Sequence, residues 1–243
     1  MWKTILKVCI LTGVAAYLTF AVTTLNRSDE NQVCRGLGII VHDADSTGFI
    51  NENEVREMLV ANKLFPEGKA IKDIDLAKME KVLVASPYID KALCYLAADG
   101  RVGIQVTSRI PVLHVLNNAG EDFYIDNRGS IMPRGYHQID LIVMTGNINK
   151  KTAGPLYAPM GRMLNKDDFW NRQIQEIHIT HAGEIEITPR IGDHIIQLGD
   201  TSALDDKLYR MRTFYTEGLD KAGWNKYKTI SLKFNNQVIC TKR

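Results

Sequence analysis

The sequence predicts an α+β protein with a single N-terminal transmembrane helix, a strand–helix–helix–strand–strand domain, and a mostly antiparallel β domain with helices. Three observations predict this organisation. The first is an uncharged, largely apolar run near the N-terminus. The second is a pair of helical stripes between strand-like segments, and the third is a series of short apolar segments separated by turn residues. The composition, with 45% hydrophobic and 24% charged residues, is ordinary for a chain that forms packed cores.

The N-terminal run spans residues 8–26, contains no charged side chain and follows two lysines. A helix over it would reach roughly 28 Å, close to the ~30 Å hydrocarbon core of a bilayer. The positive charges before the run predict that residues 1–7 are a cytoplasmic stub. Residues 27–35 are then a tether, and everything after it lies outside the cytoplasm. A cleaved signal peptide with a poor cleavage site at residues 19–21 is the alternative.

The first domain is predicted over residues 36–108. It opens with an apolar, β-branched run at residues 37–41, which is typical of a buried strand. A capping-box pattern begins a helix at Asn51, and a second helix ends before Pro87 because the residue preceding a proline avoids the α region. Asp99 and the glycine after it lie between two strand-like segments, which predicts a hairpin. Both helices are expected on one face of a three-stranded sheet.

The second domain is predicted over residues 109–243, where short apolar strands alternate with turn residues. The chain ends in a predicted hairpin with strands at residues 229–234 and 237–241 around an Asn-Asn turn. One long helix is expected where apolar residues recur at helical spacing, namely at Leu204, Leu208, Met211 and Tyr215.

One 12-residue stretch has the spacing of an EF-hand calcium loop. Asp43, Asp45, Thr47, Phe49 and Glu54 stand at ligand positions, and a glycine stands at the sharp turn. An EF-hand also needs an entering helix, and the segment before this stretch is strand-like. Two interpretations follow: a polar turn that leads into a capped helix, or a calcium-binding exported domain.

Other sites are not indicated. The net charge of +2, with interspersed signs, gives no case for a nucleic-acid partner, and no nucleotide or nucleophile motif occurs. We expect no cofactor and no small-molecule substrate. Of the four cysteines, Cys9 lies in the apolar run, so an odd number remains outside and no disulfide framework is predicted. Cys94 is interpreted as a small buried hydrophobe, and a bridge between Cys34 and Cys240 is left open.

Four segments carry patterns that recur together in one family. Residues 71–92 follow an "ID…L…L…P-x-V…A" pattern, and residues 108–111 resemble E-R-x-P with serine in place of glutamate. Residues 123–129 resemble "yyvD-x-x-G", and residues 141–146 stand where the family has an L-P-x-L-x-G run, without the proline. On these motifs the whole chain resembles the FtsQ/DivIB family of bacterial cell-division proteins.

The resemblance implies a POTRA domain followed by a β domain, in a non-enzymatic scaffold of the division machinery. Such a protein is a single-pass protein of the inner membrane, works at the septum and holds FtsB- and FtsL-like partners. Arg109 and Pro111 match family positions at the join of the two domains, with either a structural or a contact role. A POTRA protein of polypeptide translocation or envelope assembly is the alternative, but it would need a barrel of alternating strands that the remaining residues do not supply.

The resemblance also implies that partner binding uses a strand added at the C-terminal edge. Lys233 and Phe234 match a basic–aromatic pair on the preceding strand, a cation for an acidic side chain and a ring for an apolar anchor. Val238, Ile239 and Cys240 form an apolar edge run without proline or inward-facing charge. The alternative is an ordinary closing hairpin with Phe234 in the core.

Overall fold

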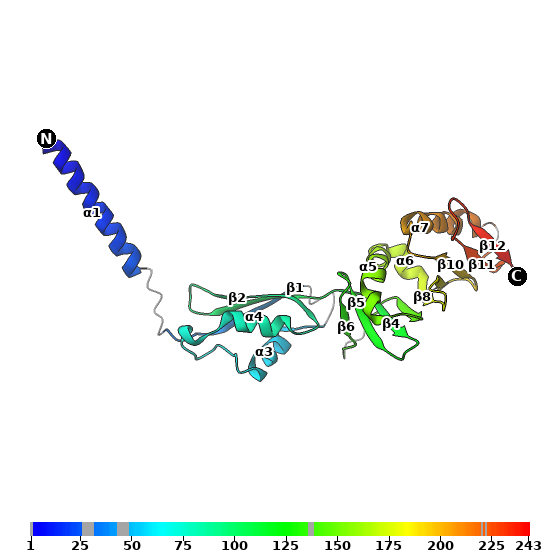
Figure 1. Ribbon diagram of the computed structural model, residues 1–243, viewed down its shortest axis with the longest axis horizontal. Helices are drawn as coiled ribbons and strands as arrows, with labels where there is room; N and C mark the ends of the chain where they lie inside the picture. The colour runs from blue at the N-terminus through cyan, green and yellow to red at the C-terminus, as the bar shows by residue number, and fades with distance from the viewer. Residues whose placement is uncertain (1, 26–31, 43–48, 136–138, 220, 222) are drawn as a thin grey trace. The chain divides into compact units, whose positions relative to one another are not determined.

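The computed structural model describes residues 2–25, 32–42, 49–135, 139–219, 221 and 223–243 (Figure 1). The chain folds into two compact units. The first unit contains Met1–Ile40, Glu52–Leu83 and Ala92–Gln105, and the second contains Val41–Asn51, Val84–Lys91 and Val106–Arg243.

Helix α1 covers Trp2–Leu25 and therefore includes most of the uncharged N-terminal run. Large apolar side chains on it are exposed, among them Leu11, Leu18 and Phe20. Over the stretches described above, no helix combines the length and the apolarity that crossing a membrane requires.

The predicted order strand–helix–helix–strand–strand is confirmed. The elements are β1 (Leu37–His42), α3 (Glu52–Ala61), the 3-10 turn η1 (Ile71–Asp73), α4 (Leu76–Val84), β2 (Ile89–Leu96) and β3 (Val102–Ser108), with sheet order β1-β3-β2. Each helix buries two apolar residues one turn apart: Val55 and Leu59 in α3, and Met79 and Leu83 in α4. The prediction for Cys94 is also confirmed, since this side chain is buried and its burial raises the pKa of the thiol to about 12.

The second unit contains one nine-stranded sheet in the order β12-β11-β10-β9-β8-β7-β4-β5-β6. Three neighbouring pairs are parallel, β4 with β7, β7 with β8, and β10 with β11, and the other five are antiparallel. The strands are β4 (Pro111–Asn117), β5 (Asp122–Asp126), β6 (Ile131–Pro133), β7 (Val143–Gly146), β8 (Ile174–Ile179), β9 (Ile185–Pro189), β10 (Ile195–Gly199), β11 (Tyr227–Ser231) and β12 (Ile239–Lys242).

Helices supply the crossovers of two of the three parallel pairs, whereas β5 and β6 lie in the connection from β4 to β7. These helices are α5 (Lys150–Lys166) and α6 (Asp168–Gln173) between β7 and β8, and α7 (Leu204–Thr213) with the π-helical turn η2 (Phe214–Leu219) between β10 and β11. The helices lie along one side of the sheet (Figure 1) and share one core with it. The predicted stripe of four apolar residues on α7 and η2 is confirmed, because Leu204, Leu208, Met211 and Tyr215 are all buried.

Strand boundaries differ from the prediction at two places. The strand predicted at residues 229–234 is observed at Tyr227–Ser231, and the strand predicted at residues 237–241 is observed at Ile239–Lys242. The Leu232 amide still donates to the Gln197 carbonyl at 2.9 Å, but the chain then turns, with Asn236 in the left-handed region at a φ of 58°. Asparagine tolerates that conformation better than most side chains do. The terminal hairpin is therefore shorter, with a longer loop, than the sequence predicts.

Candidate functional site

The last strand, β12, is the end strand of the nine-stranded sheet. It pairs antiparallel with β11, with Cys240 opposite Ile230 and Ile239 opposite Ser231. Among the described residues no strand pairs with its other side. The backbone N–H and C=O groups on that side are therefore open to an added strand.

The side chains of this edge divide between the two faces of the sheet. Cys240 lies opposite the fully buried Ile230 and packs with Val238 against the helix-covered core. This burial raises the pKa of the Cys240 thiol. Ile239 points to the opposite face and remains 43% exposed. The predicted apolar run thus presents one exposed apolar side chain, at Ile239, beside two that partly complete the core.

Lys233 and Phe234 do not lie on the preceding strand, and this part of the prediction is wrong. They follow β11 in the loop that leads to β12. The Lys233 ammonium pairs with the Glu184 carboxylate at 2.5 Å, and Gly199 makes room for its stem, since a Cβ there would lie 3.2 Å from Lys233 Cγ. Phe234 is 57% exposed, so the alternative that placed its ring in the core is also wrong.

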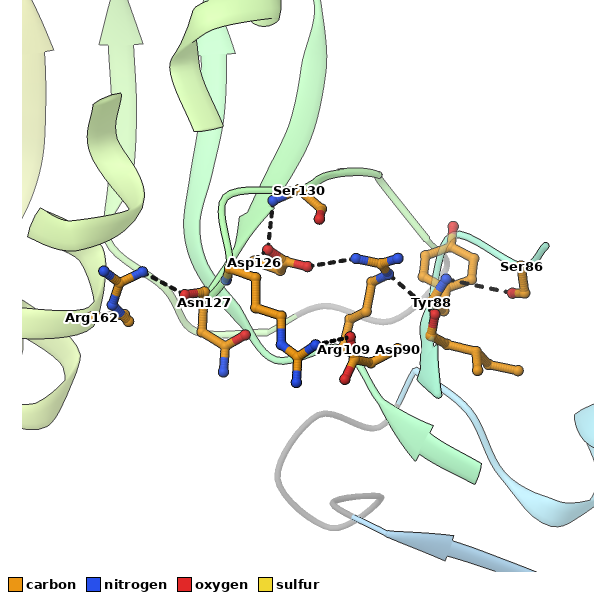
Figure 2. A network of polar contacts seen from close by, with 10 residues as sticks. Ser86, Tyr88, Asp90, Arg109, Asp126, Asn127, Ser130 and Arg162 are labelled. Carbon is orange, nitrogen blue, oxygen red and sulfur yellow. Dashed lines mark hydrogen bonds and ion pairs between the residues drawn. The ribbon is translucent and has the colours of Figure 1, made fainter. Parts of the chain in front are cut away.

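A second polar arrangement surrounds Asp126, at the end of β5 (Figure 2). Its carboxylate is 1% exposed and accepts a hydrogen bond from the Arg109 guanidinium at 2.9 Å and from the backbone N–H groups of Arg128 and Ser130. Arg109 also donates through Nε to the Ile89 carbonyl at 3.2 Å. Buried charges need such pairing because desolvation is otherwise very costly.

The turn after Asp126 is held from two further directions (Figure 2). Arg128 pairs with Asp90 at 2.9 Å, and Arg162 donates to the Asn127 carbonyl. Gly129 has a φ of 86°, and its carbonyl lies so close to Gly154 of α5 that a Cβ on Gly154 would come within 1.9 Å of the oxygen. The Asp-x-x-Gly motif therefore has a structural explanation: the aspartate folds the turn, and the glycine allows its backbone to approach a helix.

Arg109 and Pro111 are both explained by the same arrangement. Arg109 is largely buried with two acceptor partners, and Pro111 begins β4 opposite Asp126. Within the described part of the chain, the Arg109 guanidinium joins segment 84–91, through the Ile89 carbonyl, to the turn at Asp126.

The sequence-predicted calcium loop lies largely outside the described residues, since Asp43, Asp45 and Thr47 fall there. Phe49 is described: it is buried, and its ring stacks on Tyr88 with centroids 5.4 Å apart. Glu54 lies in the first turn of α3. In the described ranges no three side chains of metal-binding type gather into a cluster. Cys34, Cys94 and Cys240 are free thiols.

Models of known families match two successive segments of the chain. The model for the family described as FtsQ/DivIB, C-terminal related, matches residues 110–241, more than half of the chain. The chain belongs to the FtsQ/DivIB family. A POTRA-like domain model matches residues 32–107 of this FtsQ/DivIB protein, and the resemblance seen in its motifs is confirmed. No curated protein matches the sequence. The family comprises non-enzymatic proteins of cell division, and this assigns the chain its broad biological role.

Proposed function

We propose that this FtsQ/DivIB protein is a membrane-anchored scaffold at the division septum that captures FtsB- and FtsL-like partners and so regulates septum assembly. In this proposal the partner adds a strand to the open side of β12. The observation that carries it is the position of β12 at the end of the sheet, with one row of backbone groups unpaired among the described residues. Strand addition at such an edge is a common way to bind an extended segment.

The two edges of the sheet support the choice of β12 over β6. Strand β6 has only three residues and ends in Pro133, which cannot donate to a ladder. Strand β12 has four residues and carries no proline. Natural proteins blunt the edges that must not pair, and shortness and proline are two of the means. Pro133 therefore protects the edge at β6, whereas β12 carries no proline that would block an added strand.

The partner that fits this edge is extended, partly apolar and acidic. Phe234 and Ile239 are exposed apolar side chains next to the edge, and each can anchor an apolar side chain of the incoming segment. Lys233, Lys242 and Arg243 supply positive charge around them. Lys233 is already paired with Glu184, so an acidic partner side chain would compete with that carboxylate for the ammonium.

The membrane anchor is a separate part of the proposal. It is supported by the absence of charge from residues 8–26 and by the helix that covers most of them. Extraction of cell membranes with alkaline carbonate tests it directly. We expect the full-length chain to stay in the pellet and a variant that lacks residues 2–26 to enter the supernatant. Release of the full-length chain by carbonate would contradict the anchor.

The binding edge is tested with the full-length chain and the FtsB-like protein of the same cell, by co-purification and by titration. Removal of residues 237–243 is expected to abolish capture. Phe234→Ala is expected to weaken it by roughly 2 kcal/mol, about 30-fold, as the loss of an aromatic anchor does. Leu156→Ala removes an apolar side chain of α5 that is 47% exposed, against 57% for Phe234, and is the matched control with no expected change. Capture that survives the truncation would rule out the edge mechanism.

A further inference from the structure

Arg210 of α7 reaches the loop between β11 and β12 and donates to three of its carbonyl oxygens. Nη1 donates to Phe234 at 3.0 Å and also to Gln237, and Nη2 donates to Leu232 at 3.5 Å. Nε donates to the Asp206 carboxylate one helical turn earlier, at 2.8 Å. The side chain is only 12% exposed. All three nitrogen atoms of one guanidinium are therefore engaged, two of them on the loop.

Burial alone does not fix the conformation of this loop. Leu232 is fully buried, but residues 234–237 are all exposed. Exposed segments with few apolar contacts open easily, because little free energy opposes their conformational entropy. The contacts of Arg210 span the loop from Leu232, its first residue, to Gln237, its last but one. They set where the Phe234 ring emerges and where the chain enters β12.

A lysine could not replace this geometry. The guanidinium is a rigid planar fork, whereas an ammonium is a point charge on a flexible stem. The second arginine of the same helix, Arg212, provides a contrast: it pairs with Asp167 at 2.5 and 2.6 Å and stacks over the Phe169 ring. The two arginines thus face different neighbours, and only Arg210 contacts the terminal hairpin among the contacts described for them.

We propose that Arg210 is the positioning residue of the partner-binding edge, holding the β11–β12 hairpin in the one conformation that an added strand can extend. The inference rests on the proposed function, since it concerns the same edge. If the hairpin fluctuates without Arg210, only a fraction of molecules presents a continuous edge at any time. The apparent affinity is then the intrinsic affinity multiplied by that fraction. The association rate falls, and the dissociation rate stays nearly the same.

The test compares three variants of the full-length chain against the FtsB-like protein of the same cell, by surface-immobilised binding kinetics. Arg210→Lys keeps the charge and loses the fork. Asp206→Ala removes the ion pair with Arg210 and keeps the guanidinium that donates to the loop carbonyls. Phe234→Ala removes the proposed apolar anchor and leaves the hydrogen bonds from Arg210 to the loop carbonyls. For Arg210→Lys we expect an association rate about tenfold lower with a dissociation rate changed less than about twofold, and for Asp206→Ala both rates within about twofold.

Hydrogen exchange on the free protein supplies the second readout. In Arg210→Lys the amides of β12 (Ile239–Lys242) that pair with β11 are expected to lose protection while the amides of β8 and β9 keep it. If Phe234→Ala weakens binding but Arg210→Lys associates at the normal rate, the positioning role is wrong and the edge mechanism stands. If Arg210→Lys instead speeds dissociation and lowers protection throughout the sheet, its role is general stability and the inference fails. If neither Phe234→Ala nor loss of residues 237–243 affects binding, the proposed edge is wrong and the inference falls with it.

Discussion

Asp126→Asn is expected to destabilise the second unit strongly, although it replaces one oxygen with a nitrogen of nearly the same size. The carboxylate is almost completely buried and is the charged partner of Arg109, whose side chain is 20% exposed. An amide cannot supply that charge. Its NH₂ group would face the Arg109 guanidinium, which now donates to a carboxylate oxygen. Arg109 would keep only the Ile89 carbonyl as a partner.

The size of the effect follows from the burial. Removing one partner of a buried ion pair costs roughly 3–5 kcal/mol, because an uncompensated charge stays behind. Two features place this variant at the lower end. The remaining amide oxygen can still accept from the backbone N–H groups of Arg128 and Ser130, and a fifth of Arg109 can reach water. We therefore expect a loss of about 3 kcal/mol in the free energy of unfolding.

Urea unfolding of the full-length chain in detergent, followed by tryptophan fluorescence, measures this loss. Trp170 and Trp224 both lie in the second unit, so their signal reports its unfolding. The exposed pair Asp168–Arg172 of the same unit gives the control, and Asp168→Asn is expected to shift the urea midpoint little. The double variant Arg109→Met, Asp126→Asn leaves no unpaired charge and should lose less than the sum of its single variants. A loss below about 1 kcal/mol for Asp126→Asn would refute the reasoning, since the buried pair would then act like a surface one.

Two further predictions concern the same unit and the same unfolding assay. Burial lowers the pKa of His194, which hydrogen-bonds the Tyr215 hydroxyl at 2.7 Å, so the folded state keeps the imidazole neutral while the unfolded chain protonates it near 6.5. The free energy of unfolding should therefore fall as pH drops below 6.5 towards the lowered pKa, and His194→Phe should flatten this dependence; an unchanged slope would contradict it. Gly154→Ala should cost roughly 3 kcal/mol, because its Cβ would meet the Gly129 carbonyl; an unchanged urea midpoint would contradict this.

The sequence predicted the elements whose evidence is local. The stripe from Leu204 to Tyr215 is periodic, so the buried face of α7 follows from spacing alone, and Gly100, at a φ of 80°, occupies the turn of the predicted hairpin. Helix α5 is harder to predict from the sequence, because Pro155 and Pro159 lie inside it. Each proline removes one backbone hydrogen bond of the helix. Seven small or apolar residues of its buried face outweigh that loss, and this packing is a tertiary effect that no local pattern records.

The candidate site was predicted less completely, for the same reason. The edge position of the terminal hairpin could be expected from its place in the chain. The partners of its charged residues could not, since Glu184 lies 49 positions before Lys233, and Arg210 is 24 and 27 positions from two of the carbonyls that it binds. The spacing of Asp206 and Arg210 was the one available signal, and it indicates only an i,i+4 pair on a helix.

Burial of Ile230 and Leu232 holds one face of the terminal hairpin, and charged contacts hold its periphery, which suits the proposed open edge. Three cations hold it: Arg210 on the loop carbonyls, Lys233 on Glu184, and Arg243 on the Asp193 carbonyl at 2.8 Å. Further apolar burial of the hairpin would cover Phe234 and Ile239, the exposed side chains proposed as anchors for an added strand. Because the hydrogen bonds go to backbone and carboxylate oxygens at the periphery, the edge is held in place while its apolar side chains stay exposed.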